Sequence, residues 1–138
     1  MKAFFDSSAY SKRFFDEKGS DAVEEICSQT TSLALSIISI PEIVSALNRH
    51  LRESTISEVD YSEIKRVIFE DIKDVVIINI TPNVITRSIS ILEHNVARAM
   101  DALHVACAIE WGSDLFVSSD RRQIQAAIKE GLRYQFIS

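Results

Sequence analysis

The chain has 138 residues, of which 46% are hydrophobic and 25% charged, a profile typical of a soluble globular protein with a core of its own. Its formal net charge of −5 gives no overall attraction to nucleic acid or to an anionic membrane. Any contact with nucleic acid must therefore be local, through basic residues or a bound cation.

Short apolar runs alternate with helical patterns along the chain. In chain order, the predicted elements are strand 3–5, helix 7–15, helix 21–30, strand 33–38, helix 41–51, helix 57–73, strand 75–80, helix 82–93, helix 99–111, strand 115–117, helix 121–129 and strand 134–137. Residues 99–111 are apolar nearly all round, which indicates a central buried helix. Residues 75–80 form a β-branched run, which favours a strand buried on both faces.

This alternation predicts an α/β fold with a mostly parallel sheet covered by helices on both faces. The three glycines and two prolines are spread out and no repeat is visible, so we expect a single domain over residues 1–138. In such folds ligands bind at the carboxyl ends of the strands.

The cysteines and the absence of a long apolar segment indicate the cellular compartment of the protein. Cys27 and Cys107 lie in helical apolar patterns without a CxxC spacing, which predicts reduced core thiols. No signal peptide is visible, and no apolar run approaches the roughly 18 residues of a membrane span. We expect a cytoplasmic protein with no membrane partner.

Four acidic residues occupy predicted helix starts: Asp6, Glu42, Asp101 and Asp120. Each alone has a structural explanation. Asp6 and Asp120 are good helix N-caps, Glu42 can reach back to the Ser39 N–H in a capping box, and Asp101 can complement a helix dipole.

Taken together, the four acids predict a cation site, because all four helix starts belong to one edge of the predicted sheet. Two ionised carboxylates about 4 Å apart repel by about 4 kcal/mol at an effective dielectric near 20. Mg²⁺ or Mn²⁺ relieves this repulsion, since hard cations prefer oxygen ligands, and the lack of a dense His/Cys cluster argues against zinc. Such a cation activates water and neutralises charge on a phosphodiester.

The residues around these acids resemble a known family. The segments FDSSAYSKR at 5–13, PEIVSAL at 41–47, RAMDALHVA at 98–106 and SSD at 118–120 are similar, in order and spacing, to PIN domains, in particular the VapC-type ribonuclease toxins of VapBC toxin–antitoxin modules.

The resemblance implies a three-layer α/β/α fold with about five strands, Mg²⁺- or Mn²⁺-dependent endoribonuclease activity on RNA, a VapB-like antitoxin as partner, and a homodimer. It also implies the site residues. Asp6, Glu42, Asp101 and Asp120 match the family's acidic quartet, and Ser7 and Ser118 match its hydroxyl positions beside the metal.

The four acids are not ranked equally as ligands. We expect Asp6 and Asp101 to be the principal metal ligands, and Glu42 and Asp120 to complete the site, through water where they do not bind directly. His104, three residues after Asp101, is expected to pack or to support the site rather than to act as a base.

Several basic residues lie near the predicted site, although most basic residues simply face solvent. Arg49 is seven residues from Glu42 on the same helical face and is a candidate phosphate contact, as are Lys12 and Arg13.

Two other functions remain open. One is a non-catalytic interaction module with a PIN-like fold. The other is an aspartyl-phosphate phosphotransfer domain with Asp6 as acceptor, although Ser8 stands where such domains commonly carry a second acid.

Overall fold

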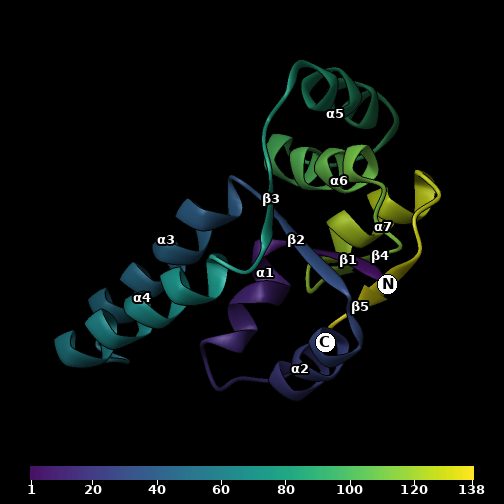
Figure 1. The fold of residues 1–138 in the computed structure, drawn as a ribbon. Coiled ribbons are helices and arrows are strands. Elements are labelled where there is room, and N and C mark those ends of the chain that lie inside the picture. The colour runs from purple at the N-terminus through teal and green to yellow at the C-terminus, as the bar shows by residue number, and fades with distance from the viewer.

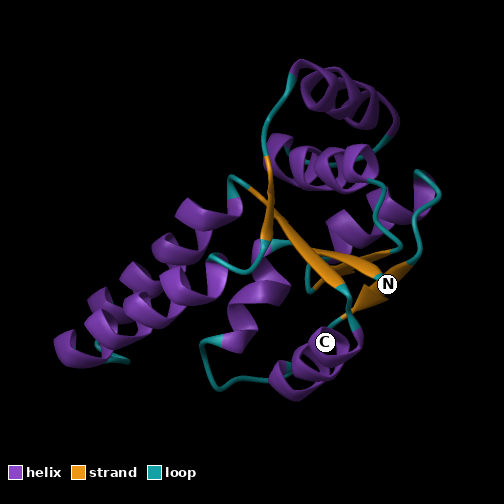
Figure 2. Cartoon of the chain, in the orientation of Figure 1, coloured by secondary structure: helices purple, strands orange, loops and turns teal.

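The computed structural model describes residues 1–138 and contains one five-stranded sheet with helices on both faces (Figures 1 and 2). The strands are β1 Lys2–Phe5, β2 Ser32–Ser36, β3 Val76–Ile78, β4 Leu115–Ser118 and β5 Tyr134–Phe136. The helices are α1 Ser7–Tyr10, the 3₁₀ turn η1 Ser11–Arg13, α2 Ser20–Gln29, α3 Ser39–Arg52, α4 Glu58–Ile72, α5 Pro82–His94, α6 Ala99–Trp111 and α7 Arg121–Lys129. The α/β fold inferred from the sequence is confirmed.

All strand pairs are parallel, and the strand order is β3-β2-β1-β4-β5. The chain therefore builds the sheet outward from β1 in one direction and then returns to build it in the other. The order reverses between β1 and β4, where Phe5 lies opposite Val117. The helices that leave β1 and β4 diverge at this point, which makes it the place where open parallel sheets bind ligands.

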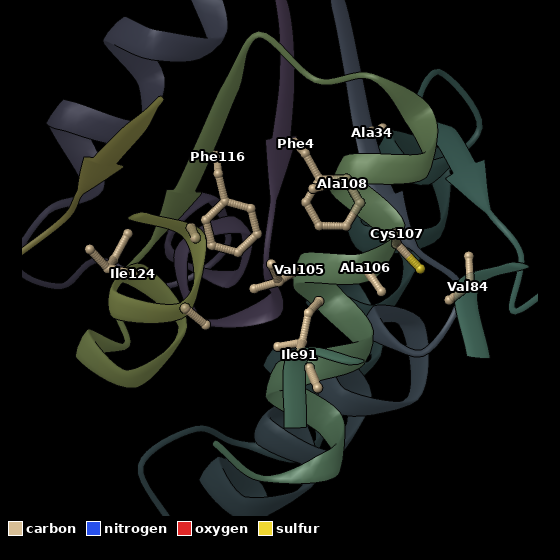
Figure 3. Packing of buried hydrophobic residues seen from close by; sticks show 13 residues of the cluster. Phe4, Ala34, Val84, Ile91, Val105, Ala106, Cys107, Ala108, Phe116 and Ile124 are labelled. Atoms are coloured by element: carbon tan, nitrogen blue, oxygen red, sulfur yellow. The ribbon is translucent and has the colours of Figure 1, made fainter. Parts of the chain in front are cut away.

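Alternate residues of the strands face two separate cores. Phe4 and Phe116 face α5, α6 and α7, and their rings stack with centroids 5.8 Å apart (Figure 3). Phe5 and Val117 face the opposite side, where the buried residues come from α1, α2, α3 and α4. The period of two along a strand thus places one helical layer on each face of the sheet.

Beyond shifts of one or two residues at their ends, two predicted elements differ from the observed ones in continuity or in position. The helix over 7–15 is divided into α1 and η1, where the Ser11 hydroxyl donates to the Ser8 carbonyl (3.2 Å) and competes with regular helical bonding. The strand over 75–80 is shortened to β3 and lies at an edge of the sheet, with Val76 exposed, so the expectation of burial on both faces was wrong. Its β-branched residues reflect strand propensity rather than a central position.

The C-terminal end of α6 follows a local signal in the sequence. Gly112 adopts a positive φ of 79° directly after the helix, a conformation that glycine reaches without strain. As the sequence predicted, α6 is a buried helix over its middle, where residues 101–108 are buried or half-buried. It packs against α5, which forms the outermost layer in Figure 1.

The expectations for cysteines and membrane spans can also be compared with the structure. Cys27 and Cys107 are both free thiols; Cys107 is buried and Cys27 is half-buried. None of the helices has both the length and the apolar character that crossing a bilayer requires.

Candidate active site

Asp6 follows the last residue of β1 and caps the N-terminus of α1. Its Oδ1 accepts from the Ala9 N–H (3.0 Å), and the Ser8 hydroxyl lies within hydrogen-bonding distance of both oxygens (2.8 and 2.7 Å). The Ser118 hydroxyl donates to Oδ2 (2.8 Å), and the side chain of Asp6 is fully buried. The N-cap interpretation of Asp6 is therefore confirmed, and the cap is part of a larger network.

The register of β1 and β4 explains why Ser118 contacts Asp6. Phe5 pairs with Val117, and the Asp6 N–H continues the ladder by donating to the Val117 carbonyl (3.0 Å). The residue after Val117 therefore lies beside Asp6. The Ser118 Oγ also accepts from the Asp120 N–H (2.9 Å), so one hydroxyl links two of the four acids.

Glu42 lies in the first turn of α3. Its Oε1 accepts two hydrogen bonds, from the Ser7 hydroxyl (2.9 Å) and from His104 Nε2 (2.7 Å). The predicted capping box with Ser39 is wrong: α3 begins at Ser39, its N-cap is Ile38, and no side chain caps it. Glu42 instead links α3 to α1 and α6.

Asp101 lies in the first turn of α6 and is almost fully buried. Its Oδ2 accepts from the Arg98 N–H (3.2 Å), which makes Asp101 the carboxylate of a capping box. Its Oδ1 accepts from the side-chain Nε2 of Gln123 on α7 (3.1 Å). Both oxygens of Asp101 are thus oriented by the protein.

Asp120 follows β4 and caps α7, as the sequence predicted. Its Oδ1 accepts from the Arg122 N–H (2.9 Å), whereas its Oδ2 accepts no hydrogen bond from the protein. The four acids therefore all lie at the carboxyl edge of the sheet. Ser118 links Asp6 to Asp120, and Ser7 and His104 bind Glu42, whereas Asp101 is held separately by Arg98 and Gln123.

Two side chains of this network, Ser8 and Gln123, had no assigned role in the sequence, and a third, His104, was expected to pack or to support the site. Ser8 orients Asp6, Gln123 orients Asp101, and His104 orients Glu42. The position of Ser8 two residues after Asp6 was a usable signal, because a hydroxyl there can bond to the cap. His104 and Gln123 contact residues on other elements, so no local pattern identifies their partners.

The pKa values of Asp6 and Glu42 are shifted in opposite directions. Burial raises the pKa of Asp6 above its ordinary value, against the opposing influence of His104 and of the hydrogen bonds from Ala9, Ser8 and Ser118. Burial alone would also raise the pKa of Glu42, but the hydrogen bond and charge of His104 and the hydrogen bond from Ser7 hold this pKa below its usual value. A nearby positive charge would therefore favour the ionised form of Asp6.

The chemistry of these donors fits a hard divalent cation, because all four candidate ligands offer carboxylate oxygen. Glu42 Oε2 and Asp120 Oδ2 accept no hydrogen bond from the protein and so retain acceptor capacity. The structure contains no group of three or more histidine, cysteine, aspartate or glutamate side chains gathered closely enough to enclose an ion. The assignment of Asp6 and Asp101 as the principal ligands of a cation, with Glu42 and Asp120 completing the site, therefore stays a prediction.

The candidate phosphate contacts differ in whether they already bond to other groups of the protein. Lys12 donates to the Lys18 carbonyl (2.7 Å), and Arg13 pairs with Glu24 (3.0 Å) and Asp71 (2.8 Å). Arg49 is exposed on α3, and Arg98 is 75% exposed at the start of α6. Of the residues named from the sequence, Arg49 is the one without an intramolecular ion pair.

Comparisons with known proteins agree with this fold. The family model described as PIN domain matches residues 3–129. No curated protein matches the chain.

Solved structures of other proteins share this fold. A DNA-bound VapBC from Salmonella typhimurium has a TM-score of 0.71 at 13% identity, covering 99% of this chain and 98% of that one. A sarcin–ricin loop cleaving VapC toxin from Mycobacterium tuberculosis has a TM-score of 0.67 at 13% identity, covering 90% and 94%. At these identities the likeness concerns the fold.

Proposed function

The chain belongs to the PIN domain family, and from this premise we propose that it is a Mg²⁺- or Mn²⁺-dependent endoribonuclease, the toxin of a VapBC-type module. One observation carries the proposal. Four carboxylates from four separate elements lie at the carboxyl edge of the sheet, around the point where the strand order reverses, and each is oriented by hydrogen bonds of its own. Helix capping alone would not require the donors on other elements that bind Asp6, Glu42 and Asp101.

The division of work within the site follows from these contacts. A divalent cation, when bound, supplies activation of water and neutralisation of charge on the phosphodiester. Asp6 and Asp101 hold the cation, because each is buried and has its oxygens oriented by neighbouring donors. Glu42 and Asp120 each keep one oxygen without a protein partner and complete the site through water.

The hydroxyl groups and the nearby cations have supporting roles. Ser7 orients Glu42, and Ser118 orients Asp6 while also binding the Asp120 N–H. Exposed Arg49, on the helix that begins beside Glu42, contacts the phosphate backbone of the RNA. Lys12 and Arg13 contribute less to RNA binding, because both are held in pairs within the protein.

Asp6→Asn tests the activity most directly. The substitution keeps the shape of the side chain but removes the charge that holds the cation, so Mg²⁺-dependent cleavage of RNA should fall by about 100-fold or more. The matched control is Asp16→Asn, which removes the same charge from an exposed residue outside the site and should cleave like the wild type. Full Mg²⁺-dependent cleavage and toxicity in Asp6→Asn would contradict the proposal.

The two rival functions are separated by other measurements. A non-catalytic module predicts that titration calorimetry detects no Mn²⁺ binding. A phosphotransfer domain predicts a stable acyl-phosphate on Asp6. No feature of the site favours that reaction, since Ser8 replaces the second acid and both Asp6 oxygens lie within hydrogen-bonding distance of hydroxyl groups, Oδ1 of Ser8 and Oδ2 of Ser118.

The partners form part of the same proposal. Structures of similar fold are VapBC complexes from Salmonella typhimurium and nontypeable Haemophilus influenzae, which supports a VapB-like antitoxin as the partner that inhibits this chain. We propose that the free protein is a homodimer that acts on RNA in the cytoplasm. Sedimentation equilibrium tests the dimer, and a mass near 15.5 kDa would contradict it.

A further inference from the structure

The histidine of α6 has surroundings that packing alone does not explain. His104 is fully buried, and its neighbours on α6 include the buried Ala102, Val105 and Ala106. Its Nε2 bonds to Glu42, while its Nδ1 is buried without any partner. A buried polar atom without a hydrogen bond is destabilising, so an aliphatic residue would fill this space at lower cost.

The Glu42 side chain is fixed through one oxygen only. Oε1 accepts from both His104 Nε2 (2.7 Å) and Ser7 Oγ (2.9 Å), and Nε2 must be the donor because a carboxylate offers only acceptors. Oε2 has no protein partner, and the side chain is 31% exposed. Two donors from α1 and α6 thus restrict a side chain that would otherwise sample several rotamers.

We infer that His104 is a positioning residue, which, with Ser7, holds Glu42 so that Oε2 is the oxygen presented to a cation or to its water ligands. The inference rests on the proposed function and adds to it a role for a residue outside the acidic quartet. His104 does not touch the substrate; it acts through Glu42. Donors that orient metal-binding side chains commonly change metal affinity by about 10–100-fold when they are removed.

A double-mutant cycle on Mn²⁺ affinity tests this role, with the dissociation constant measured by titration calorimetry on the full chain. The four proteins are the wild type, His104→Leu, Glu42→Gln and the double variant. His104→Leu keeps the side-chain volume but removes the donor, and it should weaken Mn²⁺ binding by about 10-fold. In the Glu42→Gln background the same change should alter the dissociation constant by less than about 2-fold, because the group that His104 positions is no longer a carboxylate.

A purely structural role gives a different result. If His104 matters only for packing, its effect on Mn²⁺ affinity is equal in both backgrounds or absent in both, and either result overturns the inference. Wild-type protein that binds no Mn²⁺ would remove the proposed function together with this inference. Wild-type protein that binds Mn²⁺ and cleaves RNA, but shows additive effects, would remove the inference alone.

A second pair of variants keeps the test valid if His104→Leu does not fold. His104→Gln retains an N–H donor at a reach close to that of Nε2, whereas the shorter His104→Asn does not reach Glu42. The Gln variant should bind Mn²⁺ within about 3-fold of the wild type, and the Asn variant should bind about 10-fold more weakly. Equal affinities for the two variants would contradict the positioning role.

Discussion

Asp6 and Glu42 are carboxylates of the same candidate site, yet their surroundings shift their pKa values in opposite directions. Asp6 has no exposed surface, and burial raises its pKa despite three side-chain and backbone donors. Glu42 is half-buried, and its bonds to His104 and Ser7 outweigh the effect of burial and lower its pKa. In the metal-free protein the charge therefore rests more readily on Glu42 than on Asp6.

This difference predicts how Asp6→Asn changes stability with pH. The pKa of Asp6 is raised on folding above its ordinary value of 3.8, so the favourable contribution of the protonated form is present below that pH and is lost as the pH rises through the folded-state pKa. The Asn variant has no such loss. In EDTA, the stability of Asp6→Asn relative to the wild type should therefore increase from pH 4 to pH 7.

Urea unfolding at several pH values measures this trend. The control is Asp16→Asn, at an exposed residue, and its stability relative to the wild type should not follow the same trend with pH. A stability difference between Asp6→Asn and the wild type that stays constant from pH 4 to pH 7 would show that Asp6 ionises as easily in the folded chain as in the unfolded one.

A polar cluster holds α1 and η1, the two elements that follow Asp6, against α4. The Tyr10 hydroxyl donates to Asp71 Oδ2, and Arg13 Nη1 donates to the same oxygen (2.8 Å). Burial and the contact with Asp71 raise the pKa of Tyr10 far above its ordinary range, so its hydroxyl remains a donor. Because α1 begins at Asp6, this cluster also supports one side of the candidate site.

Tyr10→Phe should lower the free energy of unfolding by about 1–2 kcal/mol, because it leaves the half-buried Asp71 with one partner fewer while the ring packing is kept. Glu70→Gln is the matched control. It breaks an exposed pair with Lys73 (3.1 Å), and exposed pairs contribute about 0–1 kcal/mol. Urea denaturation measures both changes. Equal losses in the two variants would mean that the Tyr10–Asp71 bond adds nothing beyond an exposed ion pair.

Across the whole molecule, the site depends on two cores that share one sheet. Phe4 and Phe116 belong to the core beneath α5, α6 and α7 (Figure 3). Phe5 and Val117 belong to the core of the opposite layer. Asp6 and Ser118 directly follow these strand residues, so the packing of both layers sets their separation. The α3–α4 pair extends away from the sheet in Figure 1 and contributes Glu42 from its inner end.

Phe116→Ala should cost about 3–5 kcal/mol, because it removes a fully buried ring stacked on Phe4. Val59→Ala on α4, where the side chain is 79% exposed, should change stability by less than about 0.5 kcal/mol. Helical circular dichroism and the fluorescence of Trp111, the single tryptophan, should report the same unfolding midpoint if the two layers unfold together. Separate midpoints would indicate that each layer unfolds as its own unit.

Local sequence patterns were sufficient for most elements of this fold. The bounds of α6 and α7 agree with the predicted helices over 99–111 and 121–129, since Gly112 and the Asp120 cap are signals within a few residues of the helix ends. The position of β3 at the sheet edge was not predictable, because a β-branched run has the same pattern at an edge as at the centre. Strand order depends on which layers pack together, and periodicity does not encode it.

The sequence alone was sufficient to place the four acids at helix starts, because each lies within a motif of neighbouring residues. What the tertiary structure decided is how each acid is held. His104 and Glu42 are 62 positions apart, and Ser118 and Asp6 are 112 apart. A local pattern shows which residues cap a helix, whereas bonds between distant side chains depend on the strand order and register that bring them together.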